Sequence, residues 1–243
     1  MSDLSSDLLD ALRGAEGVVA LTGSGVSAES GVPTFREAQT GLWERFDPQE
    51  LATPEAFARD PRLVWEWYEW RRTLVERAEP NAGHLALAEL EQWLPAFVLV
   101  TQNVDGLHQR AGNRRVTELH GNILRSKCSF EGAIVDDYDP GEAPPPCPSC
   151  GAPLRPDVVW FGEPLPTEAF GTASDAARAC DLFLSVGTSS LVYPAAGLPF
   201  EALENGAVLV EINPDETPLS AHADHRLRGP AGEMLSMLTK AIF

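Results

Sequence analysis

Basic residues are scarce in this sequence, and lysine is nearly absent. Only Lys127 and Lys240 are lysines among 18 basic residues, against 36 acidic ones, so the formal net charge is −18. A surface of this sign repels nucleic-acid phosphates and anionic membranes and favours basic partners such as lysine-rich peptide segments. Acidic surfaces also simply keep proteins in solution, so the charge favours one class of partner without deciding it. We expect no nucleic acid and no membrane among the partners.

Cysteine and long hydrophobic runs are also scarce. Four cysteines with uneven spacing do not form the framework of a disulfide-rich secreted domain. No apolar run approaches the length of a membrane span. The N-terminus carries Asp3, Asp7 and Asp10 and lacks the basic start and apolar core of a signal peptide. We therefore expect a soluble, cytoplasmic protein.

Short apolar runs alternate with helical patterns along the 243 residues, of which 44% are hydrophobic. The expected strands are Val18–Leu21, Ala96–Thr101, Val116–Glu118, Leu182–Val186 and Ala207–Ile212. The expected helices are Leu4–Arg13, Pro54 to about Ala78, His84–Gln92, Asp105–Ala111, Phe170–Cys180, Pro194–Asn205 and Pro230–Phe243. This alternation predicts an α/β fold, a Rossmann-like doubly wound parallel sheet covered by helices on both faces.

Residues 126–157 differ from the rest, because they contain three of the four cysteines and almost no periodic apolar pattern. They predict a small lobe that is organised by something other than a hydrophobic core.

Glycines and polar residues follow the expected strands. The first strand leads into Gly23 and Gly25, a turn that would place backbone N–H groups at a helix start, where they can bind a pyrophosphate. A glycine pair alone is equally typical of an ordinary tight turn. Amides and small residues also follow later strands, at 102–108, 187–190 and 213–215. Carboxyl strand ends line the ligand crevice of a doubly wound sheet, so their joint placement favours a nucleotide site.

At this point the sequence resembles the sirtuins, the NAD-dependent protein-lysine deacylases. The matching strings are GSGVSAESGVPTFR (23–36), TQNVDGLHQRAG (101–112), ELHGNI (118–123), VVWFGEPLP (158–166), GTSSLVYPAAG (187–197) and EINPD (211–215), together with the cysteine lobe. The resemblance implies a Rossmann-type NAD-binding domain (1–36, 84–124 and 158–243) and a small domain made of a helical insert (37–83) and a zinc-ribbon-like insert (125–157). NAD and an acyl-lysine peptide would meet between the two.

The resemblance assigns NAD, the co-substrate, to two groups of residues. The phosphate loop and the pocket for nicotinamide and its ribose would use Gly23, Ser24, Gly25, Ala28, Glu29, Arg36, Gln102, Asn103 and Asp105. The adenosine side would use Gly187, Thr188, Ser189, Asn213, Pro214, Asp215 and Ala231.

His120 is the general base that the resemblance implies, with Asn103 and Asp105 as its catalytic partners. In the family reaction the acyl oxygen attacks the anomeric carbon of the nicotinamide ribose as nicotinamide leaves. The histidine then removes a proton from a ribose hydroxyl, and the products are lysine, nicotinamide and O-acyl-ADP-ribose. An imidazole titrates near ~6.5 and can accept a proton at neutral pH. Without the resemblance, a histidine in this position would more often cap a helix or a turn.

Two segments would flank the peptide, which adds between them as a strand. Their proposed substrate-binding residues are Val159, Trp160, Phe161, Gly162, Glu163, Leu191, Val192 and Tyr193. The alternative, that Val158 to Phe161 belong to the core, holds for alternate residues of such a strand.

Tyr68 and Arg71 are three residues apart on an expected helix, so they share a face. A guanidinium binds a carboxylate through two parallel hydrogen bonds, and a phenol adds a donor beside it. The pair matches the Tyr-x-x-Arg signature of the sirtuin branch that removes succinyl, malonyl and glutaryl groups. The alternative is a tryptophan-rich packing helix with a solvated arginine.

Cys147 and Cys150 form one half of a zinc ribbon, and Cys128 begins the other, but Glu131 stands where a cysteine would complete it. A carboxylate can bind zinc, so three thiolates with Glu131 or water would make a site, whereas a weak or absent metal is equally consistent with the sequence. Cys180 is expected in the core.

Four other activities compete with a broad acidic-group deacylase. The chain could be mainly a deacetylase, or an oxidoreductase that uses NAD as a hydride carrier. It could also be a module that transfers or binds ADP-ribose, or a zinc-ribbon nucleic-acid binder, which the charge and the incomplete cysteine set disfavour.

Overall fold

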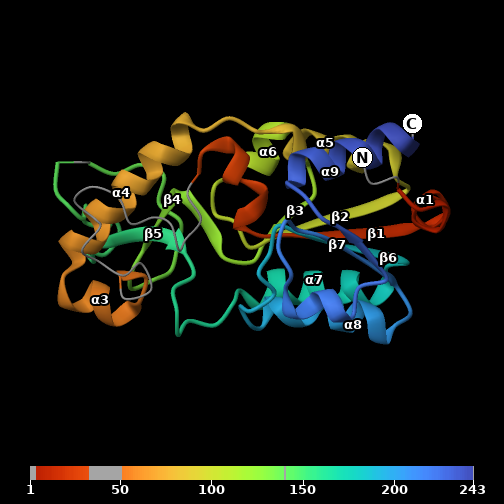
Figure 1. The fold of residues 1–243 in the computed structure, drawn as a ribbon. Coiled ribbons are helices and arrows are strands. Elements are labelled where there is room, and N and C mark those ends of the chain that lie inside the picture. Colours follow the sequence, from red (N-terminus) through yellow and green to blue (C-terminus); the bar gives the residue numbers. More distant parts are fainter. Residues whose placement is uncertain (1–3, 33–50, 140, 243) are drawn as a thin grey trace.

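The computed structural model describes residues 4–32, 51–139 and 141–242. A larger body is built on a parallel sheet, and a smaller lobe lies at one end of it (Figure 1). Across the described residues, no helix is long and apolar enough to cross a lipid bilayer.

The sheet has six strands, and every neighbouring pair is parallel. In spatial order the strands are β3 (Val116–Glu118), β2 (Ala96–Thr101), β1 (Gly17–Thr22), β6 (Leu182–Val186), β7 (Val208–Ile212) and β8 (His225–Leu227). At its centre Thr22 pairs with Thr101 on one side and with Val186 on the other. The predicted fold class is confirmed.

Helices cover both faces of this sheet (Figure 1). One face carries α1 (Ser6–Gly14), α5 (Ala82–Trp93) and α9 (Ala231–Ile242), and the other carries α7 (Thr167–Ala179) and α8 (Leu198–Glu204). Successive residues of β1 point to opposite faces, so Val18 and Ala20 enter the first core, whereas Val19 and Leu21 enter the second. Burial on both faces explains why this strand reads as a continuous apolar run.

The smaller lobe contains α3 (Pro54–Arg59), α4 (Pro61–Arg77) and an antiparallel pair, β4 (Gly121–Cys128) and β5 (Leu154–Val158). Its aromatic core includes Trp67, Tyr68 and Trp160. A second, smaller cluster joins Trp65 and Leu154 to two of the cysteines. The lobe is thus held partly by packing from α4, although residues 126–157 show little apolar periodicity.

The structure differs from the expected local structure in several places. The helix expected from Pro54 to Ala78 is broken, because the Asp60 carboxylate accepts the Leu63 N–H at 3.0 Å and starts a new helix at Pro61. The expected helix 194–205 begins as a 3₁₀ turn and becomes α8 only at Leu198. The edge strand β8 was not expected, because His225–Leu227 contains no β-branched residue, whereas the equally short β3 begins with a valine and a threonine.

A group of polar side chains lies buried among strands β1 and β2 and helices α5 and α6 (Leu107–Ala111). The Thr22 hydroxyl donates to Thr101 Oγ1 at 2.8 Å, so His108 Nε2, 2.9 Å away, must donate to Thr22. The His84 ring lies 4.9 Å from the His108 ring. Burial lowers the pKa of His84 to about 4 and that of His108 to about 3, so both imidazoles are neutral at pH 7.

We expect these two histidines to destabilise the protein in mild acid. The unfolded chain binds their protons below about pH 6.5, whereas the folded protein resists protonation until the pH nears the lowered pKa values. The free energy of unfolding should therefore fall with pH, by on the order of 2 kcal/mol per histidine between about pH 7 and pH 5.

Urea unfolding over this pH range measures the effect. In His108→Gln, the free energy of unfolding should fall less between pH 7 and pH 5, because the contribution of His108 is gone. The same change at exposed His222 should leave the dependence of this free energy on pH unaltered. A His108→Gln variant with the full wild-type pH dependence would contradict this explanation.

Candidate functional site

The carboxyl ends of four central strands meet at one edge of the sheet. The Gln102 N–H donates to Thr22 O at 3.0 Å and the Gly187 N–H to Ile212 O at 2.9 Å. The Gly23 N–H donates to Val186 O at 3.0 Å. Each loop therefore begins as a continuation of the sheet, and segments far apart in sequence are fixed beside one another.

The loops after β1 and β6 approach each other so closely that only glycine fits. A Cβ on Gly25 would lie 2.7 Å from the Gly187 carbonyl oxygen. A Cβ on Gly187, whose φ is +59°, would lie 2.5 Å from the Val26 nitrogen. These glycines place two backbone segments in direct contact, as a dinucleotide-binding turn requires.

The structure differs from the expected helix start after β1. Two 3₁₀ turns, Ser24–Val26 and Ala28–Ser30, follow the strand, and the Gly23 and Gly25 N–H groups donate to carbonyls of the β6 strand and its loop. Those two amides are thus used within the protein, while Ser24 and Ala28 are exposed beside them. Arg36 lies outside the described residues.

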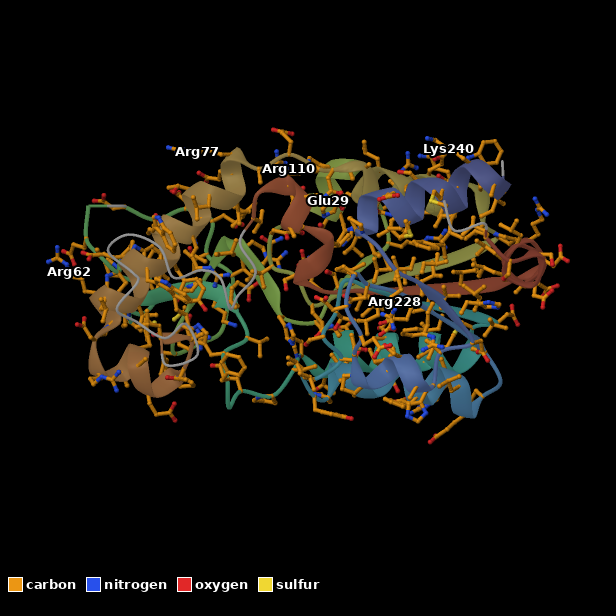
Figure 2. All side chains as sticks on the ribbon, in the orientation of Figure 1. Glu29, Arg62, Arg77, Arg110, Arg228 and Lys240 are labelled. Atoms are coloured by element: carbon orange, nitrogen blue, oxygen red, sulfur yellow. The ribbon has the colours of Figure 1, made fainter. Side chains whose placement is uncertain are left out.

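Glu29 has a partner that its predicted phosphate-loop role did not include. Its carboxylate accepts the Gly232 N–H at 2.7 Å, at the start of α9 (Figure 2). A negative charge there complements the positive end of the helix. Glu29 therefore ties the first loop to the start of α9, whose first residue, Ala231, is buried.

Thr188 links three strand ends. Its hydroxyl accepts from Gln102 Nε2 at 3.1 Å, and its carbonyl accepts from Asn213 Nδ2 at 2.8 Å. Ser189 is half-buried, whereas Pro214 and Asp215 are exposed. The predicted NAD residues after β2, β6 and β7 are therefore brought together.

Behind the hydrogen-bonded side chains of Gln102, Thr188 and Asn213, the Ser27 hydroxyl is the centre of a buried hydrogen-bond network. It donates to Asp105 Oδ2 at 2.7 Å and accepts from Asn103 Nδ2 at 3.1 Å. His84 Nδ1 accepts the Asn81 N–H, so His84 Nε2 carries the proton and donates to Ser27 Oγ at 3.3 Å. The direction of every hydrogen bond around Ser27 is thus fixed.

Burial and the hydrogen bonds around Asp105 act in opposite directions on its pKa. Burial raises the pKa of this carboxyl, and hydrogen bonds from the Leu107 N–H and the Ser27 hydroxyl oppose the rise. Ser27 and His84 were absent from the predicted site. Ser27 stands inside the glycine-loop string and His84 begins an expected helix, but nothing in either local pattern indicates that they meet.

His120 lies directly beside the 102–105 loop. Its Nδ1 is 2.9 Å from the Gln102 carbonyl oxygen, which can only accept, so Nδ1 carries the proton and Nε2 holds the lone pair. Burial lowers the pKa of His120, and the hydrogen bond to Gln102 partly offsets this. The half-buried imidazole is therefore neutral at pH 7 and can accept a proton at Nε2.

The backbone N–H groups after β5 donate to partners within the protein. The N–H groups of Val159 and Phe161 donate to His120 O and Ala52 O, each at 2.9 Å. Trp160 is buried, and its N–H donates to the Glu163 carboxylate.

Glu163 in turn makes an ion pair with buried Arg155, whose guanidinium lies 3.2 Å from the centre of the Trp160 ring. Trp160 and Glu163 therefore have partners within the protein, and the burial of Val158 and Trp160 between less buried neighbours follows the expected alternation.

Exposed apolar side chains remain on both flanking segments. Phe161 is 44% exposed, Leu191 53%, Val192 39% and Tyr193 71%, and Gly162 is exposed as well. Such side chains are typical of a binding surface when they cluster.

Tyr68 and Arg71 share one face of α4, as their spacing predicts. The buried Tyr68 hydroxyl accepts from Trp160 Nε1 at 3.0 Å, and burial raises its pKa to about 12. The Arg71 guanidinium lies 4.9 Å from the Trp67 ring centre and 5.8 Å from that of Tyr68. Burial lowers the pKa of Arg71. The phenol therefore stays neutral and can still donate its own proton beside a positive charge.

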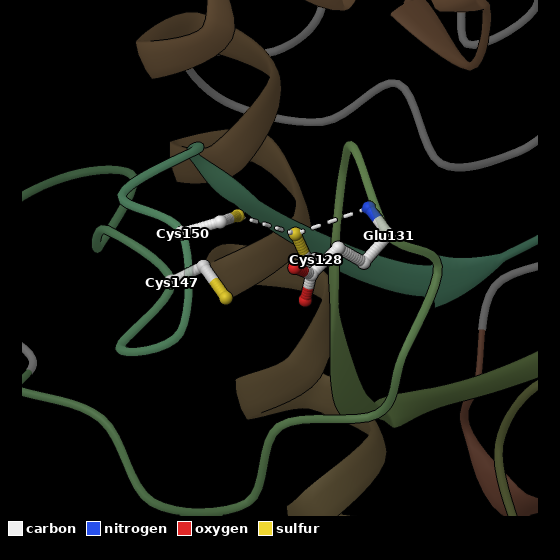
Figure 3. A group of neighbouring side chains, drawn as sticks. All are labelled: Cys128, Glu131, Cys147 and Cys150. Carbon is white, nitrogen blue, oxygen red and sulfur yellow. Dashed lines mark hydrogen bonds between the residues drawn. The ribbon is translucent and has the colours of Figure 1, made fainter.

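Three cysteines and one glutamate form a compact cluster in the smaller lobe (Figure 3). Ligand atoms of Cys128, Glu131, Cys147 and Cys150 all lie within 4.8 Å of one another. Thiolate and carboxylate donors at this spacing fit a tetrahedral zinc ion. Cys180 lies elsewhere, buried against α7, where its thiol donates to Ala177 O at 3.3 Å.

Comparisons with known proteins agree with this geometry. The Sir2 family model matches residues 23–194. The NAD-dependent protein deacylase of Aquifex aeolicus is 54% identical over 216 residues, which cover 88% of this chain and 90% of the relative. The NAD-dependent protein deacylase of Methylococcus capsulatus is 50% identical over 249 aligned positions, which cover 99% of this chain and 98% of the relative.

Solved structures give the same answer. A crystal structure of a Sir2 homolog–NAD complex superimposes with a TM-score of 0.93 at 46% identity, covering 99% of this chain and 94% of that one. A mutant Sir2 homologue bound to 2′-O-acetyl ADP ribose superimposes with a TM-score of 0.92 at 46% identity. The superposition covers 98% of this chain and 96% of that one. A Sir2 complex with a p53 peptide and NAD⁺ gives 0.88 at 30% identity, with coverage of 98% of each chain. This chain belongs to the Sir2 family.

Proposed function

We propose that this protein is an NAD-dependent protein-lysine deacylase, which transfers an acyl group from lysine to ADP-ribose and releases nicotinamide. The relatives that carry the deacylase name, and the homologue complexes with NAD, acetyl ADP ribose and a peptide, support this activity. The observation that carries the proposal is the neutral His120 imidazole, hydrogen-bonded to the carbonyl of Gln102 in the loop that contains Asn103 and Asp105.

In this proposal the carboxyl edge of the sheet holds NAD. The contact of Gly25 with Gly187 holds the loop that carries the exposed Ser24, which is assigned to the phosphates. Asn103 and Asp105 lie at the nicotinamide end, where the Ser27 network orients both side chains. The residues assigned to adenosine are Gly187, Thr188, Ser189, Asn213, Pro214, Asp215 and Ala231. Bound NAD supplies the glycosidic bond whose cleavage releases nicotinamide.

His120 then acts as the general base. Its Nδ1 donates to Gln102 O, so its Nε2 is the atom that takes a proton from a ribose hydroxyl. The Gln102 carbonyl also stabilises the imidazolium that results. Burial, which holds the pKa below its ordinary value, ensures that the base is unprotonated before the step.

We further propose that the acyl pocket accepts succinyl and malonyl, and by extension glutaryl, as well as acetyl groups. Arg71 offers a guanidinium held against two aromatic rings, and Tyr68 offers a neutral O–H on the same face of α4. Together they match the two oxygens of a carboxylate at the end of an acyl chain. The acyl-lysine segment would lie along the exposed apolar residues Leu191 to Tyr193 and beside Phe161 and Gly162.

Replacing the base tests the reaction. His120→Ala should lower kcat by about 10²–10⁴-fold, because general-base catalysis contributes about that much, while NAD still binds. Formation of free lysine peptide and O-acyl-ADP-ribose measures turnover, and calorimetry measures NAD binding. His222→Ala, a histidine change on the exposed surface, is the control. Unaltered turnover in His120→Ala would remove the assignment.

Replacing the arginine tests the acyl preference. Arg71→Met should reduce kcat/KM for succinyl-lysine relative to acetyl-lysine by about 10–100-fold, because hydrogen bonds to charged groups are worth about 1.5–3 kcal/mol. Arg62→Met is the matched control, since Arg62 lies on the same helix but at the exposed far end of the lobe (Figure 2). An unchanged ratio in Arg71→Met would favour a deacetylase.

One assay separates the competing activities. Acetyl-, succinyl- and malonyl-lysine peptides at equal concentration, with and without NAD, are followed by mass spectrometry. A deacylase gives free lysine peptide and acyl-ADP-ribose only with NAD. Modified protein without acyl-ADP-ribose would indicate ADP-ribosyl transfer, and NADH absorbance would indicate hydride transfer.

A further inference from the structure

The two loops that carry the cysteine cluster have the same backbone turn. In the first, the Gly132 N–H donates to Cys128 O at 3.0 Å, and in the second the Gly151 N–H donates to Cys147 O at 2.8 Å. Both glycines have positive φ, +72° and +75°. The turns therefore correspond residue by residue, and Glu131 occupies in the first the position that Cys150 occupies in the second.

The Glu131 carboxylate is directed toward the three sulfurs. Its ligand oxygen lies within 4.8 Å of each Sγ atom, the same limit that holds among the sulfurs themselves (Figure 3). Its backbone N–H donates to Cys128 Sγ at 3.3 Å, which fixes the start of the side chain. The Ser149 hydroxyl, on the opposite loop, contacts Glu131 Oε1 at 3.5 Å. The carboxylate therefore lies where a fourth ligand would complete the three thiolates.

Zinc accepts a carboxylate oxygen in place of a sulfur in a tetrahedral site. We propose that Glu131 is the fourth ligand of a Cys₃Glu zinc site formed with Cys128, Cys147 and Cys150. A ligating carboxylate is itself usually hydrogen-bonded, and Ser149 supplies that contact. The inference concerns metal ligation alone and does not depend on the proposed deacylase activity.

A site with three thiolates and one carboxylate should release zinc more easily than a site with four thiolates. Thiolates bind zinc more strongly than carboxylates in a sulfur-rich site, so the Glu131–zinc bond is the weakest of the four. Glu131 and Cys150 are exposed, whereas Cys128 and Cys147 are buried. A chelator should therefore remove zinc from the Glu131 side, and more readily than it would from a site with a full set of thiolates.

Metal binding to the full chain tests this. Zinc affinity is measured by competition with a chromophoric chelator for wild type, Glu131→Ala, Glu131→Cys and Asp137→Ala. The last variant removes an exposed charge of the same lobe outside the cluster. Loss of a partner that only supports a ligand weakens metal binding about 10–100-fold, so Glu131→Ala should raise the Kd by at least that much. Glu131→Cys should bind more tightly than wild type, and Asp137→Ala should equal it.

Cobalt(II) substitution gives a second measurement that does not require the alanine variant to fold. The intensity of thiolate-to-cobalt absorption should be higher in Glu131→Cys than in wild type, by the contribution of one additional thiolate. Equal absorption in the two proteins would show that position 131 does not reach the metal, and a Glu131→Ala variant with wild-type affinity would indicate water as the fourth ligand. Either result would overturn the proposal. Wild-type protein that binds no zinc would overturn it as well.

Discussion

The contact between the backbone after β1 and the backbone after β6 governs the geometry of this site. Gly25 and Gly187 meet with no room for a side chain on either. This contact, together with the hydrogen bonds that extend the strands into their loops, sets the positions of Gln102, Thr188 and Asn213. The close arrangement of these amide and hydroxyl side chains at the sheet edge depends on two residues that lack a Cβ atom.

Burial then determines the chemistry of the polar groups behind those side chains. It raises the pKa of Asp105 and lowers those of His84, His108 and His120. The imidazoles are therefore neutral hydrogen-bonding groups at pH 7, and their tautomers are set by the backbone groups and hydroxyls that face them. Ser27 joins Asp105 to His84, so one hydroxyl orients an acid from one loop and a base from a distant helix.

Much of the fold could be predicted from the sequence, because parallel strands buried on both faces read as uninterrupted apolar runs. β2, β3 and β6 have their predicted bounds. The smaller lobe was harder to predict. Its strand pair is organised around cysteines and the tryptophans of α4 rather than by its own periodicity.

Among the predicted site residues, Trp160 and Glu163 are held by partners within the protein. The buried Arg155 that holds them is revealed only by the packed structure. Ser27 and His84 were missed for the same reason, since the contact between them joins residues that are 57 positions apart.

The sequence by itself determined the order of strands and helices, the glycine turn, the amide-rich strand ends and the incomplete cysteine set, because each is a local pattern of residue types. Only the tertiary structure decided which of these groups touch. Hydrogen-bond direction, burial and the inward turn of the Glu131 carboxylate arise when distant segments pack together. Those are the properties that fix a proton or hold a metal ion, and they depend on distances that residue order does not encode.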